Sequence, residues 1–592
     1  DGSLWLANRG YIGRLTEKGW EAVGPQVADQ RPLIAAAAND GGLWVYFLLK
    51  HRLMHYHADG SLETFRAPAI NEIRELCEDH SGMVWIGSTL TGLVRLKPGE
   101  TNYNRAITIA NGLANNVVLA ITEDKENNLW VGTGSGGLHR LVARRFTNIG
   151  LAQGLPNPIV RAVIEESPGH LLVGTHGGGM ARVQDGRVVS VHRSTNDFAA
   201  ASAFIWSELC DHAGRIWLGT FNGGLLYESN GVEHAFEPWP ETLSKTITCL
   251  HEDAQNRIWM GTLWGLGVME NDQVRPFLSE SNQPLAGVNI RCIVEDKSKG
   301  VLWLGTYDDG IFRVEEEKVT HFGTNEGLPA GHICSVTLDS DGCIWAGVYQ
   351  KGIIGIRDGK IVQINSKNGL PAHTIGSMLE DGLGNFWLGS ERGILRVAIS
   401  GVHQAWTNPA AQIAFDVFDA NDGLASLECA EGFQNTALRD TAGRLWFATQ
   451  KGVATVDPGS LRLNTNPPPV IIERVTFTDR AGSQTVLENP GRATLPAGAT
   501  ELKIDYAALS YTAPDKIHFV CRMEGVKSWA ETNRLHSQIF HTLDPGDYHF
   551  AVRAANNDGL WNKRETVFDF KVEPFLWQTT VFWAVVLGGL AM

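Results

Sequence analysis

The sequence predicts an all-β fold in which β-propeller repeats are followed by an immunoglobulin-like β-sandwich and by the start of a transmembrane helix. Three observations carry this prediction. The 592 residues include 65 glycines and 19 tryptophans but only 8 methionines, which favours many short strands with tight turns and aromatic packing. A motif recurs along most of the chain at the period of a propeller blade. The pattern then changes, and the sequence ends in an apolar run.

The charge of the chain argues against a nucleic-acid partner. The formal net charge is −15 at pH 7. Binding to nucleic acid needs a concentrated basic surface that displaces counterions from phosphates. We therefore expect no nucleic-acid partner for this segment.

The repeated motif reads D-x-x-G-x-[ILV]-W-[ILV]-G-T and is clearest in Asp211–Thr220 and Asp253–Thr262. Eleven copies align on the tryptophan position, at intervals of 39 to 45 residues except for a last interval of 59. A period near 42 is that of a four-stranded blade. The tryptophan position is occupied by Trp5, Trp44, Trp85, Trp130, Leu172, Trp217, Trp259, Trp303, Trp345, Trp387 and Trp446.

One copy can be divided directly into four strands, which we expect at 247–251, 258–262, 266–270 and 274–278. The Asp and Gly of the first turn supply side-chain-to-backbone bonding and a tolerated positive φ. The tryptophan is expected to fill the space between neighbouring blades. The motif positions that recur from copy to copy are therefore expected to have structural roles.

The eight cysteines are scattered, and none forms the C-x-x-C pair that would suggest zinc or a redox motif. Cys249 and Cys292 fall in a column of small residues, four positions before the acidic residue that opens each turn. Small side chains suit the crowded innermost strands of a propeller. We expect the cysteines to be packing residues rather than ligands or disulfide partners.

A second signature, N-G-L-P or a close variant, stands between blades. It occurs at 111–113, 153–156, 326–329, 368–371 and 422–424. Together the two signatures resemble the two-component regulator propeller repeat, which is found in extracytoplasmic sensors of bacterial signalling proteins. The resemblance covers about three quarters of the chain. It implies a sensor region, and members of that family have two consecutive seven-bladed rings.

Counting seven tryptophan positions back from Trp446 reaches Leu172. The resemblance therefore implies a complete seven-bladed propeller at 151–462 and a partial N-terminal propeller of about four blades at 1–150. Four blades cannot close a ring, so we expect the early blades of the first ring to precede Asp1. The long last interval contains an insertion at 405–436, whose function the sequence leaves open.

A different domain is expected after the Pro-rich stretch that begins at Asn466. Residues 467–573 alternate apolar and polar positions in about seven short runs, which is typical of an immunoglobulin-like sandwich. The segments 543–550 and 555–562 resemble the Y_Y_Y domain, which in this family links the propellers to the membrane. Cys521 and Phe540 stand where tyrosines are common in that domain.

Residues 575–592 are predicted to begin a transmembrane helix. Trp577 and Trp583 suit an interfacial belt, and an apolar run follows to Met592. The run of twelve residues from Val581 is shorter than the roughly 20 that span a bilayer, so the helix is expected to continue beyond this sequence. A buried core helix is the alternative.

No catalytic residue and no metal site is predicted, and no cofactor is expected. The Glu-Asp pairs such as Glu252-Asp253 recur in the same turn of each repeat, which an active site would not do. Asp339-Ser-Asp341-Gly342 resembles part of a calcium loop but lacks its later oxygen ligands. The histidines show no H-E-x-x-H spacing.

Candidate ligand-binding residues lie just after the G-T of each blade, in turns expected on one face of the ring. Aromatic side chains next to carboxylates, amides and a cation suit a sugar-like ligand, although a solvated turn surface is an equally good reading. The candidates are Trp264, Tyr307, Asp308, Asp309, Tyr349, Gln350, Glu391 and Arg392.

We therefore predict the periplasmic, extracytoplasmic ligand-sensing region of an inner-membrane two-component protein. Its cytoplasmic output, a histidine kinase in most proteins of this kind, would follow the helix. The expected partners are a small-molecule or oligosaccharide ligand, the membrane, and a second copy that pairs through the Y_Y_Y domain. The alternatives are a polysaccharide hydrolase or lyase, the sensor of a diguanylate cyclase, and a membrane-anchored adhesion protein.

Overall fold

The structure is a computed structural model. It describes residues 4–8, 11–23, 32–47, 51–68, 70, 72–99, 106–192, 204–229, 232–277, 285–461, 463–488, 491–524, 527–531, 536–541 and 543–590. The chain is all-β, as predicted, and divides into two compact units. Unit 1 combines residues 1–143 with 463–592, and unit 2 is formed by residues 144–462.

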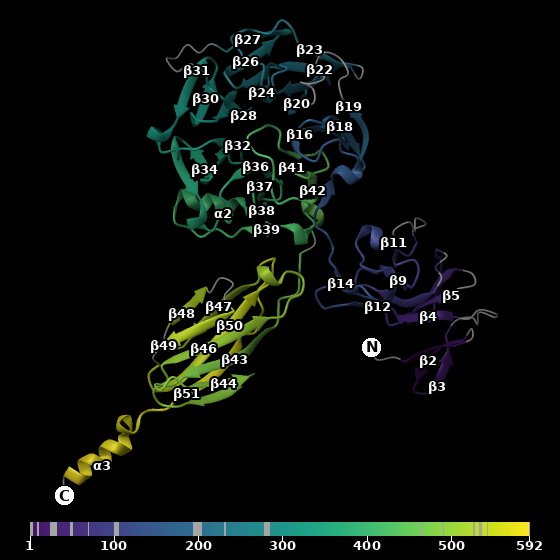
Figure 1. Cartoon of the computed structure of the whole chain (residues 1–592), viewed down its shortest axis with the longest axis vertical. Helices are drawn as coiled ribbons and strands as arrows, with labels where there is room; N and C mark the ends of the chain where they lie inside the picture. The colour runs from purple at the N-terminus through teal and green to yellow at the C-terminus, as the bar shows by residue number, and fades with distance from the viewer. Residues whose placement is uncertain are drawn as a thin grey trace. The chain divides into compact units, whose positions relative to one another are not determined.

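Unit 2 contains, in its described residues, seven four-stranded antiparallel sheets, which Figure 1 shows around a circle. Six of them follow the chain order from the inside outward. Their strands are β16–β19 (Val160–Ser167, His170–Thr175, Gly179–Gln184, Arg187–His192), β20–β23 (Ile205–Cys210, Ile216–Thr220, Leu225–Ser229, Val232–Ala235), β24–β27 (Ile247–Glu252, Ile258–Thr262, Gly265–Glu270, Gln273–Pro276), β28–β31 (Ile290–Asp296, Val301–Thr306, Ile311–Glu315, Lys318–Phe322), β32–β35 (Ile333–Leu338, Ile344–Val348, Gly352–Arg357, Lys360–Ile364) and β36–β39 (Ile375–Glu380, Asn385–Ser390, Gly393–Ala398, Asp416–Phe418).

The seventh sheet joins the two ends of unit 2. Strands β40 (Ala437–Arg439), β41 (Leu445–Thr449) and β42 (Gly452–Val456) are completed by β15 (Thr147–Ile149), which pairs antiparallel with β42. The first strand of each sheet contacts that of the next, and β40 and β41 contact β16. The repeat period alone does not assign residues 147–149 to this sheet, because their partner lies some 300 residues further along the chain.

The predicted strands of the copy at 247–278 agree with β24–β27 to within two residues, although Leu278 lies outside the described residues. The aspartate of the repeat also has a role that the sequence did not reveal. Asp253 Oδ1 accepts the backbone N–H groups of Gln255 and Arg257, while its Oδ2 accepts the indole N–H of Trp259 at 2.7 Å. In six other copies the tryptophan likewise donates its indole N–H to the aspartate six positions before it. These tryptophans are Trp85, Trp130, Trp217, Trp345, Trp387 and Trp446.

This turn predicts how stability depends on pH. Burial raises the pKa of Asp253, but the bonds from Trp259 and Arg257 outweigh it, so the pKa is lowered from 3.8. A carboxyl whose pKa is lower in the folded state stabilises the fold above its unfolded value, and this contribution is lost as the pH falls through the folded pKa. We expect Asp253→Ala to reduce the free energy of unfolding by about 1–3 kcal/mol at pH 7, and by less at pH 3. Urea unfolding at both pH values measures this, and an equal loss at both would contradict it.

The small residues of the first strands pack against the glycine of the G-T pair in the same sheet. A Cβ built on Gly261 would lie 2.2 Å from Cys249 Sγ, and one on Gly305 would lie 2.5 Å from Cys292 Sγ. Both thiols are buried, and all eight cysteines are free. Burial raises the pKa of Cys249 to about 12, so the thiol is protonated at neutral pH.

The described residues of the N-terminal part of unit 1 form four sheets. They consist of β1–β3 (Trp5–Asn8, Tyr11–Thr16, Gly19–Ala22), β4–β7 (Pro32–Ala37, Leu43–Phe47, Arg52–Tyr56, Leu62–Arg66), β8–β11 (Ile73–Glu78, Val84–Ser88, Leu93–Leu96, Ala106–Ile107) and β12–β14 (Val118–Glu123, Leu129–Thr133, Gly137–Leu141). They carry the same repeat as unit 2, with innermost strands β4, β8 and β12 in contact.

The C-terminal part of unit 1 consists of two sheets that share one apolar core. The strand orders are β44-β43-β46-β49 and β45-β51-β50-β47-β48. Val475, Phe519 and Phe568 are fully buried in this core. The strands are β43 (Val470–Thr478), β44 (Gln484–Glu488), β45 (Arg492–Leu495), β46 (Glu501–Ala508), β47 (His518–Met523), β48 (Lys527–Glu531), β49 (Ser537–His541), β50 (Gly546–Ala555) and β51 (Thr566–Val572).

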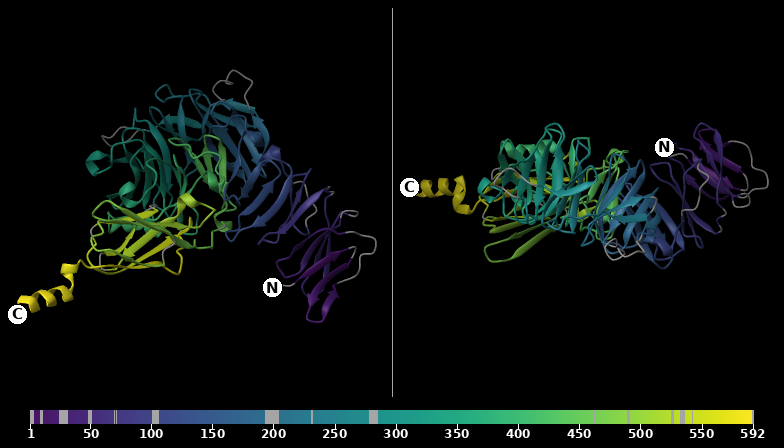
Figure 2. Two further views of the ribbon diagram at one scale, coloured as in Figure 1. Left: turned by 60° about the horizontal axis from the view of Figure 1, so that its bottom comes forward. Right: turned by 90° about the horizontal axis from the view of Figure 1, so that it is seen from above.

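The described residues include two short α-helices. The helix α2 (Ile399–His403) follows β38 in unit 2, and α3 (Thr580–Leu590) is the C-terminal helix seen in Figure 2. Within the residues that the structure describes, neither helix has the length and apolar character needed to cross a bilayer. Residues 591–592 of the predicted membrane helix lie outside the described residues.

Candidate functional site

Each first strand of the six consecutive sheets in unit 2 contains a β-bulge. In β16, for example, the pairing register shifts between Val160 and Ala162, which leaves Arg161 unpaired. A bulge re-aims one side chain and is common next to functional sites. The bulged residues are Arg161, Trp206, Thr248, Arg291, Cys334 and Gly376.

Several bulges contact the end of the insertion, Glu428–Thr436, which we call the central segment. Phe433 lies 4.8 Å from the ring of Trp206, and the Arg161 guanidinium lies 4.9 Å from the Phe433 ring centroid. Gln434 exchanges two hydrogen bonds with the backbone of Ile293 in β28. Val163 in β16 donates to the carbonyl of Asn435. The central segment thus connects strands on different sides of the circle, so it lies at the centre of unit 2.

A cavity of about 310 Å³ lies between the central segment and the two sheets β28–β31 and β32–β35. Its wall is aromatic: Tyr307 stacks on His332 with ring centroids 3.7 Å apart, and Tyr349 lies 5.5 Å from His332. The guanidinium of Arg291 lies over the Tyr307 ring, 4.7 Å from its centroid. The residues that line the cavity are Arg291, Tyr307, His332, Ile333, Cys334, Tyr349, Glu431, Gly432 and Phe433.

The cavity wall carries charged groups of both signs in a desolvated setting. Burial lowers the pKa of Arg291 and of Arg161. Burial raises the pKa of Glu431, and repulsion from Glu391 and Glu428 raises it further. The Arg291 Nε atom is buried and has no hydrogen-bond partner among the described residues. The same holds for Arg161 Nε and Trp206 Nε1, which contact Phe433 of the central segment but are not among the residues that line the cavity. Buried donors of this kind are costly to leave unpaired, so they favour a polar ligand.

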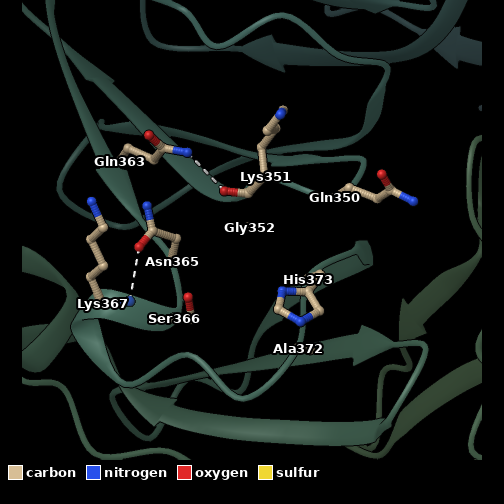
Figure 3. A pocket seen from close by; sticks show the side chains of 9 residues that line it. All are labelled: Gln350, Lys351, Gly352, Gln363, Asn365, Ser366, Lys367, Ala372 and His373. Atoms are coloured by element: carbon tan, nitrogen blue, oxygen red, sulfur yellow. Dashed lines mark hydrogen bonds between the residues drawn. The ribbon is translucent and has the colours of Figure 1, made fainter.

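A second, shallower cavity of about 210 Å³ opens beside the turn between β33 and β34 (Figure 3). Gln363 donates to the carbonyl of Lys351 at 2.9 Å, and Asn365 caps the turn at Lys367. Gln350 and His373 line the same cavity. Two of its polar side chains, Gln363 and Asn365, are thus engaged with the backbone.

The structure brings together only some of the predicted site residues. Tyr307 and Tyr349 line the 310 Å³ cavity, and Asp308 lies 3.5 Å from His332 at its edge. Trp264 is 64% exposed and is not among the residues that line either cavity.

The other predicted residues make local contacts. Gln350 lines the second cavity, and Glu391 accepts the backbone N–H groups of His373 and Thr374. The backbone N–H groups of Asp309 and Arg392 bond the hydroxyls of Thr306 and Ser390, which shapes their turns.

Sequence reasoning missed Arg291, His332, Glu431 and Phe433. One signal for Arg291 was available in the sequence. In the first strand of each repeat, a β-branched residue and a small residue stand two positions apart, as Ile290 and Cys292 do. The residue between them, here Arg291, differs widely from repeat to repeat. The central segment carries no such signal, because its place depends on contacts that are distant in sequence.

Comparison with known proteins supports the repeat assignment. The family model described as "two component regulator propeller" matches residues 112–135 and 243–264. A histidine kinase P4 of Formosa agariphila is 24% identical over 400 residues, a match that includes 64% of this chain and 25% of the kinase. This chain thus corresponds to about a quarter of the length of that relative.

A solved structure shares the fold of the chain. It is the extracellular domain of the protein described as hybrid two component system BT3049 from B. thetaiotaomicron, with 22% identity and a TM-score of 0.71. The match covers 97% of this chain and 77% of that structure. At this level of identity the likeness concerns the fold alone. The two matched segments, 112–135 and 243–264, lie one in each unit, so both units contain a segment that matches the two-component regulator propeller repeat, as the sequence resemblance predicts.

Proposed function

We propose that this chain is the extracytoplasmic ligand-sensing region of a membrane-bound two-component signalling protein. The repeat family, the match to a histidine kinase and the fold shared with an extracellular domain all support this proposal. In this proposal unit 2 is a seven-bladed propeller, and the cytoplasmic output is a histidine kinase that follows the C-terminal helix.

The 310 Å³ cavity is the observation that carries the sensing role. A sugar-like ligand would stack on Tyr307 and Tyr349 and bond to Arg291 and Glu431. Both charged groups are already desolvated, so their bonds to a ligand would be strong. Trp264, Asp308, Asp309, Gln350, Glu391 and Arg392 would contact only a ligand long enough to extend beyond the cavity.

The proposed output path runs through the C-terminal part of unit 1. Residues 467–573 would act as a Y_Y_Y domain with an immunoglobulin-like fold, and the helix that begins near Phe575 would enter the membrane. Trp577, Val581, Trp583, Val585 and Leu587 are all more than half exposed, which suits a helix that continues into lipid. A single helix transmits little by itself, so two copies are expected to pair and to change their arrangement on ligand binding.

Calorimetry of the 592-residue chain with a panel of neutral, acidic and amino-substituted oligosaccharides tests this proposal. For a ligand that binds, we expect Arg291→Ala to weaken the affinity by about 10–150-fold, since a hydrogen bond to a charged group contributes about 1.5–3 kcal/mol. Tyr307→Ala should also weaken it. Trp20 in unit 1 is 54% exposed, so Trp20→Ala is the matched control and should leave the affinity unchanged.

Two results would count against the proposal. If Arg291→Ala and Tyr307→Ala both retain the native affinity while near-UV circular dichroism shows intact folding, the cavity is not the binding site. If the oligosaccharide is recovered as cleaved product, the chain is a hydrolase or lyase instead of a sensor.

A further inference from the structure

A group of metal-ligating side chains lies in the sheet β4–β7 of unit 1, apart from the cavity of unit 2. Asp40 is in the turn between β4 and β5, and His55 and His57 stand two residues apart at the end of β6. Residues at this spacing project from the same side of a strand. His55 Nε2 lies 3.2 Å from Asp40 Oδ1, and His57 Nδ1 lies 2.7 Å from Asp40 Oδ2. One ligand atom from each residue falls within 4.8 Å of the others.

This group lies in a copy of the repeat that lacks the usual aspartate. In seven other copies, an aspartate six positions before the tryptophan accepts its indole N–H. The corresponding residue before Trp44 is Ala38. Trp44 Nε1 donates instead to Glu78 of the next sheet, at 2.9 Å. Asp40 is therefore not needed to hold the tryptophan, and its carboxylate faces the two histidines.

Both imidazole rings are held with a nitrogen directed toward Asp40. The His55 ring stacks on Trp44 at 4.1 Å with an interplanar angle of 14°. His57 Nε2 faces Glu63 on β7 at 3.8 Å, which leaves Nδ1 on the side of Asp40. A carboxylate behind the distal nitrogen of a histidine is the arrangement that orients metal-bound imidazoles and increases their basicity.

We propose that Asp40, His55 and His57 bind a divalent transition metal ion, with Zn²⁺ as the best fit. Tetrahedral zinc has bonds of about 2.0–2.1 Å to nitrogen and oxygen, which places its ligand atoms about 3.3 Å apart. The separations of 3.2 and 2.7 Å involve different oxygens of Asp40, and one ligand atom from each residue lies within 4.8 Å of the others, so side-chain shifts would bring the three ligand atoms to that spacing. Two imidazoles favour zinc over calcium or magnesium. The side chain of Asp40 is 36% exposed and that of His57 26%, so the ion can enter from solvent and keep an open fourth position.

A second group with ligand-type residues, Asp339, Cys343 and His403 in unit 2, shows what a non-binding arrangement looks like. Asp339 is more fully engaged than Asp40, whose Oδ1 accepts the backbone N–H of Gly42. Asp339 Oδ1 accepts the backbone N–H groups of Asp341 and Cys343, while its Oδ2 accepts Trp345 Nε1 and contacts His403 Nε2. Burial raises the pKa of Cys343 to about 11, so it is a thiol. This group is a structural turn.

The site is tested by removing bound metal from the 592-residue chain with a chelator and then titrating it with zinc, with binding measured by calorimetry. We expect about one equivalent to bind, with the affinity reduced by at least about 100-fold in His57→Ala and by about tenfold in Glu63→Gln. His55→Gln should also lose binding while it keeps a planar group next to Trp44. In the matched control His80→Ala, which removes an exposed histidine that pairs only with Glu123, binding should be unchanged.

Cobalt provides an independent readout, because the visible absorption of bound Co²⁺ reports its coordination. We expect a visible band for the native chain and none for His57→Ala. The proposal is overturned if native chain and His57→Ala bind zinc equally, or if the native chain binds neither ion. Far-UV circular dichroism without metal shows whether each variant is folded.

Discussion

Replacing Trp217 or Trp259 with alanine is expected to lower the free energy of unfolding of unit 2 by about 3–5 kcal/mol for each variant. Trp259 is only 2% exposed and packs between its own sheet and the next, in one cluster with Leu285 and Ile290. Trp217 occupies the same position one sheet earlier and is 1% exposed. Each substitution leaves a cavity between two sheets and removes the indole donor that Asp211 or Asp253 accepts.

Urea unfolding followed by far-UV circular dichroism measures this loss without relying on tryptophan emission. Trp264→Ala is the matched control, because Trp264 lies five residues beyond Trp259 and is 64% exposed. We expect that variant to change stability by less than about 0.5 kcal/mol. Losses below about 1 kcal/mol for both buried tryptophans would mean that these rings do not fill the space between sheets.

The local part of the fold was predictable because its determinants lie close together in the sequence. The turn at Asp253, the strand at 258–262 and the buried Trp259 fall within ten residues, and eleven copies repeat the pattern. The pairing of β15 with β42 could not be predicted in this way. Three residues that pair with a strand some 300 positions away leave no period in the sequence.

The candidate site shows the same division between local and distant determinants. Tyr307 and Tyr349 were found because each follows a recognisable G-T or G-V pair at the end of a strand. Arg291 was missed because the variable position that it occupies in the repeat does not by itself show that the residue is bulged. Phe433 and Glu431 were missed because the insertion that holds them has no repeat to align with.

Unit 1 contains a contact through which a signal could pass from the repeats to the C-terminal sheets. Glu126, in the turn between β12 and β13, accepts hydrogen bonds from Ser510 Oγ at 2.6 Å and from the backbone N–H groups of Tyr511 and Thr512. The ring of Tyr511 meets Trp130 edge-on at 5.2 Å. One carboxylate thus holds three consecutive residues that follow β46.

Glu126→Ala is therefore expected to weaken this contact, which Asn128 and Trp130 also support, and to reduce the coupling between the proposed sensing and output. Each bond to a charged acceptor contributes about 1.5–3 kcal/mol, so loss of even one shifts the contact equilibrium by about tenfold or more. In the isolated chain, hydrogen exchange at Tyr511 and Thr512 should become faster. In the proposed full-length sensor the ligand-dependent output should be reduced, while the affinity of unit 2 for the proposed ligand should stay the same because Glu126 belongs to unit 1.

Glu488→Ala provides the comparison, since the Glu488 side chain is 74% exposed and, within the described part of the chain, forms a 3.8 Å ion pair with Arg474. That variant should signal normally and exchange at the native rate. Unchanged exchange in Glu126→Ala would show that the carboxylate does not hold the Ser510–Thr512 segment. Faster exchange together with normal output would show that the contact exists but does not carry the signal, because a switch can act only through an interaction that differs between its two states.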